Sequence, residues 1–192
     1  MSRPRQYNRD EVQSKSTELF WEKGFEATSM NQVANRTGVN KYSIYNEFGN
    51  KEKLFLACID YFLHKHCFVE EILSKEPLVL KNIEAFFEYK VHSFYSETGK
   101  GCLIFNSLDE RDTLCKSANV KIDKFIFKIK VLFHHCLNAA QEKKEISKDK
   151  DYEALANYLS CFTFGLVNLG MKKMNKKELS KTIELALLII RN

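Results

Sequence analysis

Glycine and proline are scarce in this chain, whose 192 residues include seven Gly and two Pro. Tight turns between strands depend on these two residue types, so their scarcity argues against a fold with many strands. Hydrophobic residues make up 44% of the chain, which is enough to build a buried core. We therefore predict an all-α fold.

The chain also lacks a hydrophobic run long enough for a membrane. Its longest apolar tract, residues 158–171, is too short and is interrupted by polar side chains, and no apolar segment opens the sequence. Six cysteines are present, but no two of them have C-x-x-C spacing. We expect a cytoplasmic protein with no membrane partner, in which the thiols are reduced and serve mainly in packing.

Catalytic and metal-binding patterns are missing as well. The sequence contains no Gly-rich phosphate loop and no nucleophile elbow. His64 and His66 point to opposite sides of a helix, and the run from His134 to Cys136 lacks the i, i+4 spacing that places two ligands on one face. We predict no enzymatic activity, no cofactor and no metal site.

The charge of the chain is only modestly positive. Lys and Arg total 30 against 25 acids, a net charge of +5, and most of these side chains are expected on solvated helix surfaces. This excess does not by itself indicate a nucleic-acid partner. Its distribution is more informative, because Arg3, Arg5 and Arg9 form a short basic arm before the first helix signal at Asp10.

Four helices are expected in the first third of the chain. The first covers residues 10–23. A second begins after Ser29 as N-cap and ends at Gly38, and a third begins after Asn40 and ends at Gly49. The second and third are too short to be stable alone, so the first helix and a fourth must support them. Two short helices joined by a tight turn have the layout of a helix-turn-helix.

The residues of this region also match a known family. The stretch FWEKGFEATSMNQVANRTGVNKYSIYNEFGNKEKLF, residues 20–55, resembles the DNA-binding domain of TetR-family transcriptional regulators. The resemblance implies about nine helices in two domains: a helix-turn-helix DNA-binding domain, residues 1–55, and a helical ligand-binding and dimerisation domain, residues 56–192. It also implies a bacterial regulator that binds double-stranded DNA as a homodimer on a palindromic operator. We expect a repressor that is released by an unknown small molecule.

By the same resemblance, the third helix is the recognition helix. Its first turn would lie nearest the bases, while the start of the second helix, a tyrosine and a lysine would meet the phosphate backbone. The residues implied are Thr28, Ser29, Asn40, Lys41, Tyr42, Ser43, Tyr45 and Lys51. Helix capping alone is the alternative role of Thr28 and Ser29. Glu47 departs from the family pattern and would repel a phosphate.

Beyond residue 55 the chain continues with helical periodicity. We expect one long helix from residue 53 to about 75, and a next one with Pro77 in its first turn. The last two helices are apolar on all sides, so they require cover on more than one side, either within the monomer or in a dimer. The family pairs its last two long helices, which implies interface positions at Leu155, Leu159, Phe162, Leu166, Leu169, Ile183, Leu187 and Ile190.

The family reads small molecules in its C-terminal domain. Aromatic and histidine side chains there are candidates for ligand contacts, with ordinary core packing as the alternative: Phe87, His92, Phe105, Phe133 and Phe162. The segment GKGCLIFNS, residues 99–107, is similar to a G-C-L-x-x-N stretch of one subgroup. Cys102 beside Lys100 could serve as an electrophile or oxidant sensor, or simply pack.

Two other classes of function are open at this level. One is an all-α small-molecule-binding or carrier protein in which the helix-turn-helix is only structural. The other is an enzyme, although the sequence offers no catalytic set for it. A regulator should bind duplex DNA with a steep salt dependence, whereas a carrier should not.

Overall fold

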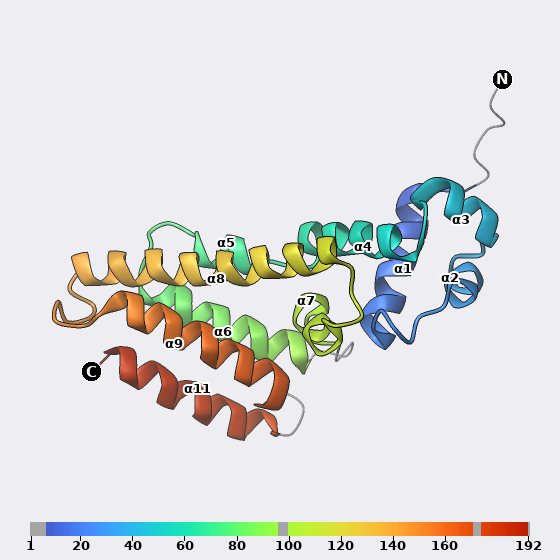
Figure 1. The fold of residues 1–192 in the computed structure, drawn as a ribbon. Coiled ribbons are helices and arrows are strands. Elements are labelled where there is room, and N and C mark those ends of the chain that lie inside the picture. Colours follow the sequence, from blue (N-terminus) through green and yellow to red (C-terminus); the bar gives the residue numbers. More distant parts are fainter. Residues whose placement is uncertain (1–6, 96–99, 171–173, 192) are drawn as a thin grey trace. The chain divides into compact units, whose positions relative to one another are not determined.

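A computed structural model describes residues 7–95, 100–170 and 174–191, and every regular element among these residues is a helix (Figure 1). This confirms the all-α prediction, and the described residues form ten α-helices where about nine were expected. The elements are α1 (Arg9–Lys23), α2 (Met30–Thr37), α3 (Lys41–Phe48), α4 (Lys51–Lys65), α5 (Val69–Leu73), α6 (Leu80–Phe94), α7 (Leu103–Asn106), the 3-10 helix η1 (Ser107–Glu110), α8 (Lys116–Glu142), α9 (Tyr152–Gly165), the π-helix η2 (Leu166–Gly170) and α11 (Lys176–Arg191).

The helices form two compact units. The first unit comprises residues 1–67 and 102–122, and the second comprises residues 68–101 and 123–192. The long helix α8 therefore begins in the first unit and ends in the second. The functional boundary predicted between residues 55 and 56 stays a prediction.

Aromatic packing holds the first unit together. Helix α1 lies against both α2 and α4, and α7 packs against α1 and α4. Phe20 of α1 and Phe25 of the following turn each lie with their ring centroids 5.0 Å from Phe55 of α4. Phe20 and Phe55 are almost completely buried. Burial of such large side chains supplies the support that the short helices α2 and α3 need.

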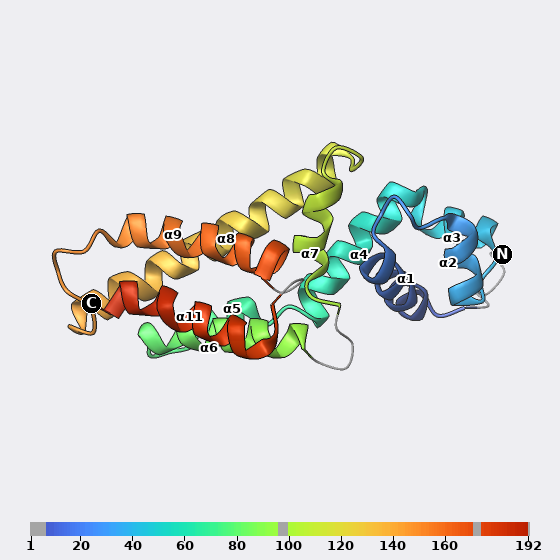
Figure 2. The ribbon, with the colours of Figure 1, turned by 90° about the horizontal axis from the view of Figure 1, so that it is seen from below.

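The second unit is a bundle around a different aromatic cluster. Helices α6 and α11 pack against each other and lie side by side in Figure 2, and α5 packs on α6. Phe86 and Phe87 of α6 are fully buried, and the ring of Phe133 from α8 lies 5.0 Å from that of Phe86. The contact between Phe87 and Phe162, 5.5 Å between ring centroids, ties α9 to this core.

The prediction of one helix from residue 53 to about 75 is wrong. Helix α4 ends at Lys65, and α5 starts again at Val69. His66 leaves the helical conformation with φ −125° and ψ −3°, and its ring packs against Trp21 of α1, 5.5 Å between centroids. This contact is tertiary, so the helical period, which continues through residues 66–68, does not reveal the break. Pro77 likewise precedes α6, which begins at Leu80, rather than lying in its first turn.

Candidate DNA-binding surface

Side-chain caps define both short helices of the first unit. The Ser29 hydroxyl oxygen accepts the Gln32 N–H at 3.2 Å, while the Ser29 N–H donates to the Gln32 side chain at 2.8 Å, a complete capping box at the start of α2. The Asn40 side chain accepts the Ser43 N–H at 2.8 Å at the start of α3. Between them, Gly38 has φ 75° and ψ 10°, the left-handed conformation that glycine adopts without strain. The sequence predicted Ser29 and Asn40 as caps and Gly38 as the turn, but not the reciprocal contact of the Gln32 side chain.

Helix α3 exposes aromatic and basic side chains together. Tyr42 is 75% exposed and Tyr45 is 37% exposed, while Ile44 and Phe48 anchor the opposite side of the helix in the core. The Lys41 ammonium lies 5.9 Å from the centre of the Tyr45 ring. Tyr42 therefore presents both its ring and its hydroxyl to solvent, next to a basic side chain.

Lys51 stands at the start of α4, where a cation opposes the positive end of the helix dipole. Its ammonium lies 4.4 Å from the centre of the Phe25 ring and donates to the Glu26 carbonyl oxygen at 3.3 Å. Partial burial lowers the pKa of Lys51, and the carboxylates of Glu110 and Glu26 act in the opposite direction. The side chain is therefore held against the turn between α1 and α2 while remaining partly exposed.

The two residues predicted at the start of α2 have different environments. Thr28 is fully buried, with its hydroxyl donating to the Gly24 carbonyl oxygen at 2.7 Å and its N–H donating to the Phe25 carbonyl at 3.3 Å. Thr28 thus supports the turn from inside. Ser29 is exposed, so its hydroxyl can reach a phosphate as well as cap the helix.

An ion pair that sequence reasoning missed lies beside α3. The Arg9 guanidinium donates to the Glu47 carboxylate at 2.9 Å and lies 5.3 Å from the centre of the Phe48 ring. The Tyr7 hydroxyl also reaches α3, where it donates to the Ser43 carbonyl oxygen at 3.3 Å. The basic charge of Arg9 offsets the negative charge of Glu47, which reduces the expected repulsion of a phosphate. Arg3 and Arg5 lie outside the described residues.

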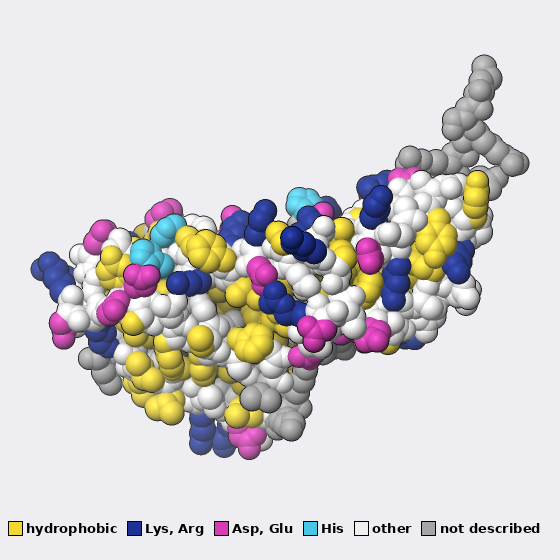
Figure 3. All heavy atoms as spheres, in the orientation of Figure 1, with side chains coloured by type: hydrophobic (Ala, Val, Ile, Leu, Met, Phe, Trp, Pro, Cys, Tyr) yellow, Lys and Arg dark blue, Asp and Glu magenta, His cyan; other side chains and the backbone are white. Residues whose placement is uncertain are grey.

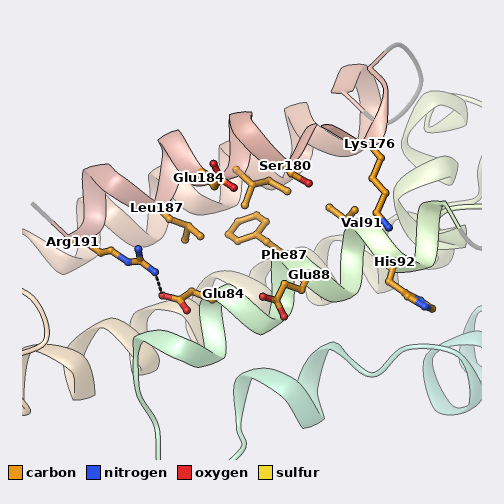
Figure 4. Close-up of a pocket in the computed structure, with 11 residues that line it drawn as sticks. Glu84, Phe87, Glu88, Val91, His92, Lys176, Ser180, Glu184, Leu187 and Arg191 are labelled. Carbon is orange, nitrogen blue, oxygen red and sulfur yellow. Dashed lines mark hydrogen bonds and ion pairs between the residues drawn. The ribbon is translucent and has the colours of Figure 1, made fainter. Parts of the chain in front are cut away.

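The predicted ligand contacts fall in different places. Phe87 and His92 line a groove of about 510 Å³ between α6 and α11 (Figure 4). Phe133 is fully buried behind Phe87, and Phe162 touches Phe87 from α9. Phe105 is buried in the first unit. The structure thus brings four of these five residues into one neighbourhood of the second unit.

Most of the predicted dimer positions point inward. Leu159, Leu166, Ile183, Leu187 and Ile190 are buried within the described chain, and Leu155 and Phe162 are half-buried; the side chain of Leu169 lies outside the described residues. Other apolar side chains of the last helices are exposed instead of these positions. They are Phe164 (46%) on α9 and Leu185 (64%), Leu188 (45%) and Ile189 (51%) on α11. Which of these residues meet a second copy stays a prediction.

All six cysteines are free thiols. Cys102 is buried immediately before α7, while Cys161 on α9 is exposed. Burial raises the pKa of both Cys58 and Cys136 to about 12. In the described part of the chain, no group of three or more His, Cys, Asp or Glu could hold a metal ion, and none of the described helices is apolar and long enough to cross a membrane.

Comparison with known proteins places this surface in a family. Residues 14–58 match the model of the bacterial regulatory proteins of the tetR family. The chain is 30% identical over 172 residues, 85% of its own length and 80% of the relative's, to the HTH-type transcriptional repressor ComR of Escherichia coli K12. It is 25% identical over 193 residues to the uncharacterized HTH-type regulator YezE of Bacillus subtilis 168, covering 99% of this chain and all of that protein.

Solved structures agree in fold. A cysteine mutant of the TetR family transcriptional regulator CifR, in complex with 26-base-pair operator DNA, superposes with a TM-score of 0.80 at 23% identity, covering 96% of this chain and 98% of that one. The helix-turn-helix formed by α2 and α3 lies in the segment that the family model matches. The chain belongs to the TetR family of bacterial regulatory proteins and is a DNA-binding transcriptional regulator.

Proposed function

We propose that this regulator represses transcription as a homodimer, with α3 of each copy in the major groove of one half of a palindromic operator. The observation that carries the assignment of α3 is the exposure of Tyr42, 75%, next to Lys41 in the first turn of a capped helix. Lys41 can donate to guanine or to phosphate, and Tyr42 can pack on a thymine methyl group. The relative ComR is named a repressor, which favours repression over activation.

The phosphate contacts are assigned to the flanking residues. Ser29 presents its hydroxyl at the start of α2, where backbone N–H groups favour an anion. Lys51 presents an ammonium beside the turn between α1 and α2. Tyr45 presents a partly exposed ring and hydroxyl one helical turn beyond Lys41. Together these groups would fix the register of α3 on the duplex without reading its sequence.

The exposed apolar side chains on the last helices support the dimer. Figure 3 shows hydrophobic side chains gathered over α9 and α11. Leu185, Leu188 and Ile189 follow i, i+3, i+4 spacing on α11, so they form one continuous stripe that water would contact in a monomer. A two-fold axis through this stripe would bring the same surface of two copies together. The resulting dimer carries two copies of α3, one for each half of the operator.

The groove between α6 and α11 is the proposed ligand site. Its floor is apolar, with Phe87, Val91, Ile183 and Leu187, and charged side chains rim it, among them the ion pair of Arg191 with Glu84 drawn in Figure 4. Pockets with an apolar floor and few polar groups suit small organic molecules. Because both Phe87 and Leu187 also belong to the core of this unit, a ligand here would shift the packing of α6 and α11.

The test uses fluorescently labelled duplexes from the DNA that flanks the coding region of this protein. Fluorescence anisotropy is followed as purified protein is added, at two salt concentrations. A regulator binds one fragment much more tightly than the others, with an affinity that falls steeply as salt rises. Equal and weak binding to all fragments would favour the alternative, a small-molecule carrier with a structural helix-turn-helix.

A further inference from the structure

We propose that Glu110 is a positioning residue for the DNA-binding surface, because its carboxylate holds the turn on which Lys51 rests. Glu110 is the last residue of η1, far along the chain from α1. One of its carboxylate oxygens accepts the Phe25 N–H at 2.7 Å, and the other accepts the Glu26 N–H at 3.0 Å. Both oxygens thus bind consecutive backbone amides, in charge-assisted hydrogen bonds.

The turn is shaped to receive this carboxylate. Gly24, which precedes the two amides, has φ 85° and ψ 171°, a conformation that residues with a side chain rarely adopt. A Cβ atom at Gly24 would lie 2.7 Å from both Glu110 oxygens. The carboxylate therefore occupies the space that a side chain would need, and the backbone conformation and the contact require glycine independently.

The two residues whose amides bind Glu110 also contact Lys51 through other groups. The Phe25 ring lies under the Lys51 ammonium, and the Glu26 carbonyl oxygen accepts a hydrogen bond from it. Glu110 binds the backbone amides of these two residues, and its charge favours the protonated form of Lys51. Movement of the Glu110 carboxylate would therefore displace both partners of Lys51 at once.

Glu110 also lies only a few residues before α8, the helix that begins in the first unit and ends in the second. Helix α7, just before η1, packs against α1 and α4. After Glu110, residues 111–115 lead directly into α8, which continues into the second unit. A change in α8 can thus reach the amides of Phe25 and Glu26 along a short stretch of chain. This inference rests on the proposed function, since it assigns Lys51 a phosphate contact.

The experiment compares Glu110→Gln with Asp112→Asn, both as the full-length chain. The glutamine has the size of the glutamate, but its amide can accept only one of the two N–H groups and turns a donor toward the other. Asp112 is exposed two residues further on, so Asp112→Asn removes the same charge from the same segment without touching the turn. Affinity for the fragment that wild type binds is measured by anisotropy over a series of salt concentrations.

We expect Glu110→Gln to weaken binding by about tenfold, as loss of one positioned phosphate contact does, and to reduce the slope of log affinity against log salt by about one. Asp112→Asn should match wild type in slope. A purely structural role would lower the amount of active protein and leave the slope unchanged. On a Lys51→Ala background, Glu110→Gln should have no further effect on the slope.

Two results would overturn the inference. One is a Glu110→Gln protein that binds the fragment with the wild-type affinity and slope, while wild type itself binds normally; only the role of Glu110 then fails. The other is a wild type that binds no duplex, which removes the proposed function as well. If Glu110→Gln does not fold, Glu110→Asp, which keeps the charge but shortens the reach, must show the reduced slope, and a wild-type slope there rejects the inference.

Discussion

Alanine at Gly24 should destabilise the first unit far more than alanine at Gly38. Both glycines have positive φ, 85° and 75°, but their surroundings differ. A Cβ at Gly38 meets no atom within 4 Å, so Gly38→Ala costs only the left-handed conformation, about 1 kcal/mol. At Gly24 the conformation is one that is nearly confined to glycine, about 2 kcal/mol.

Gly24→Ala carries a second contribution. The new Cβ would lie 2.7 Å from both oxygens of Glu110, closer than such atoms approach, so the carboxylate must move. Its hydrogen bonds to the amides of Phe25 and Glu26 are then lost or weakened, which adds about 2 kcal/mol. The total for Gly24→Ala is therefore about 4 kcal/mol, against about 1 kcal/mol for Gly38→Ala.

Trp21 makes the difference measurable. It is the single tryptophan of the chain, and its ring packs 4.9 Å from that of Phe62 inside the first unit. Urea unfolding followed by tryptophan fluorescence reports the free energy of unfolding for each variant. In a Glu110→Ala background, the effect of Gly24→Ala should fall to the backbone part alone. Equal losses at Gly24 and Gly38, or an effect of Gly24→Ala that Glu110→Ala does not reduce, would refute this reasoning.

The remaining predictions concern the dimer and the thiols. Leu188→Glu places a charge in the exposed stripe on α11, so it should convert the dimer to a monomer in sedimentation velocity and weaken operator binding by about 100-fold. The control is Phe127→Glu, at an apolar residue exposed on α8. A Leu188→Glu protein that remains dimeric would contradict the proposed interface. At pH 8, Cys161 should be alkylated quickly and Cys58 and Cys136 slowly, because a pKa of about 12 leaves a thiolate fraction of about 10⁻⁴. Mass spectrometry of the alkylated protein measures the order of reaction. If Cys102 reacts as fast as Cys161, the sensor role of Cys102 is supported. If Cys102 reacts as slowly as Cys136, the sensor role is rejected.

The sequence was sufficient where structure is decided locally. Ser29 and Asn40 cap helices through residues three positions away, and Gly38 sets a turn by its own backbone. Such signals lie within a few residues, so they can be read without knowing the fold. The exposure of Tyr42 follows in the same way, because Ile44 and Phe48 fix the buried side of a short helix.

Contacts between distant residues could not be read in this way. Glu110 binds amides 85 and 84 residues away, and nothing near it in the sequence marks it as their partner. The sequence predicts that Glu47 repels phosphate, because it does not reveal the ion pair with Arg9. Arg9 lies on another helix, 38 residues earlier. The last helices are apolar on every side, so the side that faces the core depends on the helices packed against them. Leu159 and Ile190, which the resemblance implies at an interface, are buried within the described chain, and their contact with a second copy stays a prediction.

The most direct test of the account is the effect of Tyr42→Ala on binding to the operator fragment. Phe127→Ala is the matched control, because Phe127 is an aromatic residue 64% exposed on α8, outside the candidate surface. In anisotropy titrations, Tyr42→Ala should lose about tenfold or more in affinity for the operator while keeping its affinity for unrelated duplex. Phe127→Ala should bind as wild type does. Operator affinity unchanged by Tyr42→Ala would contradict the assignment of α3 as the helix that reads DNA.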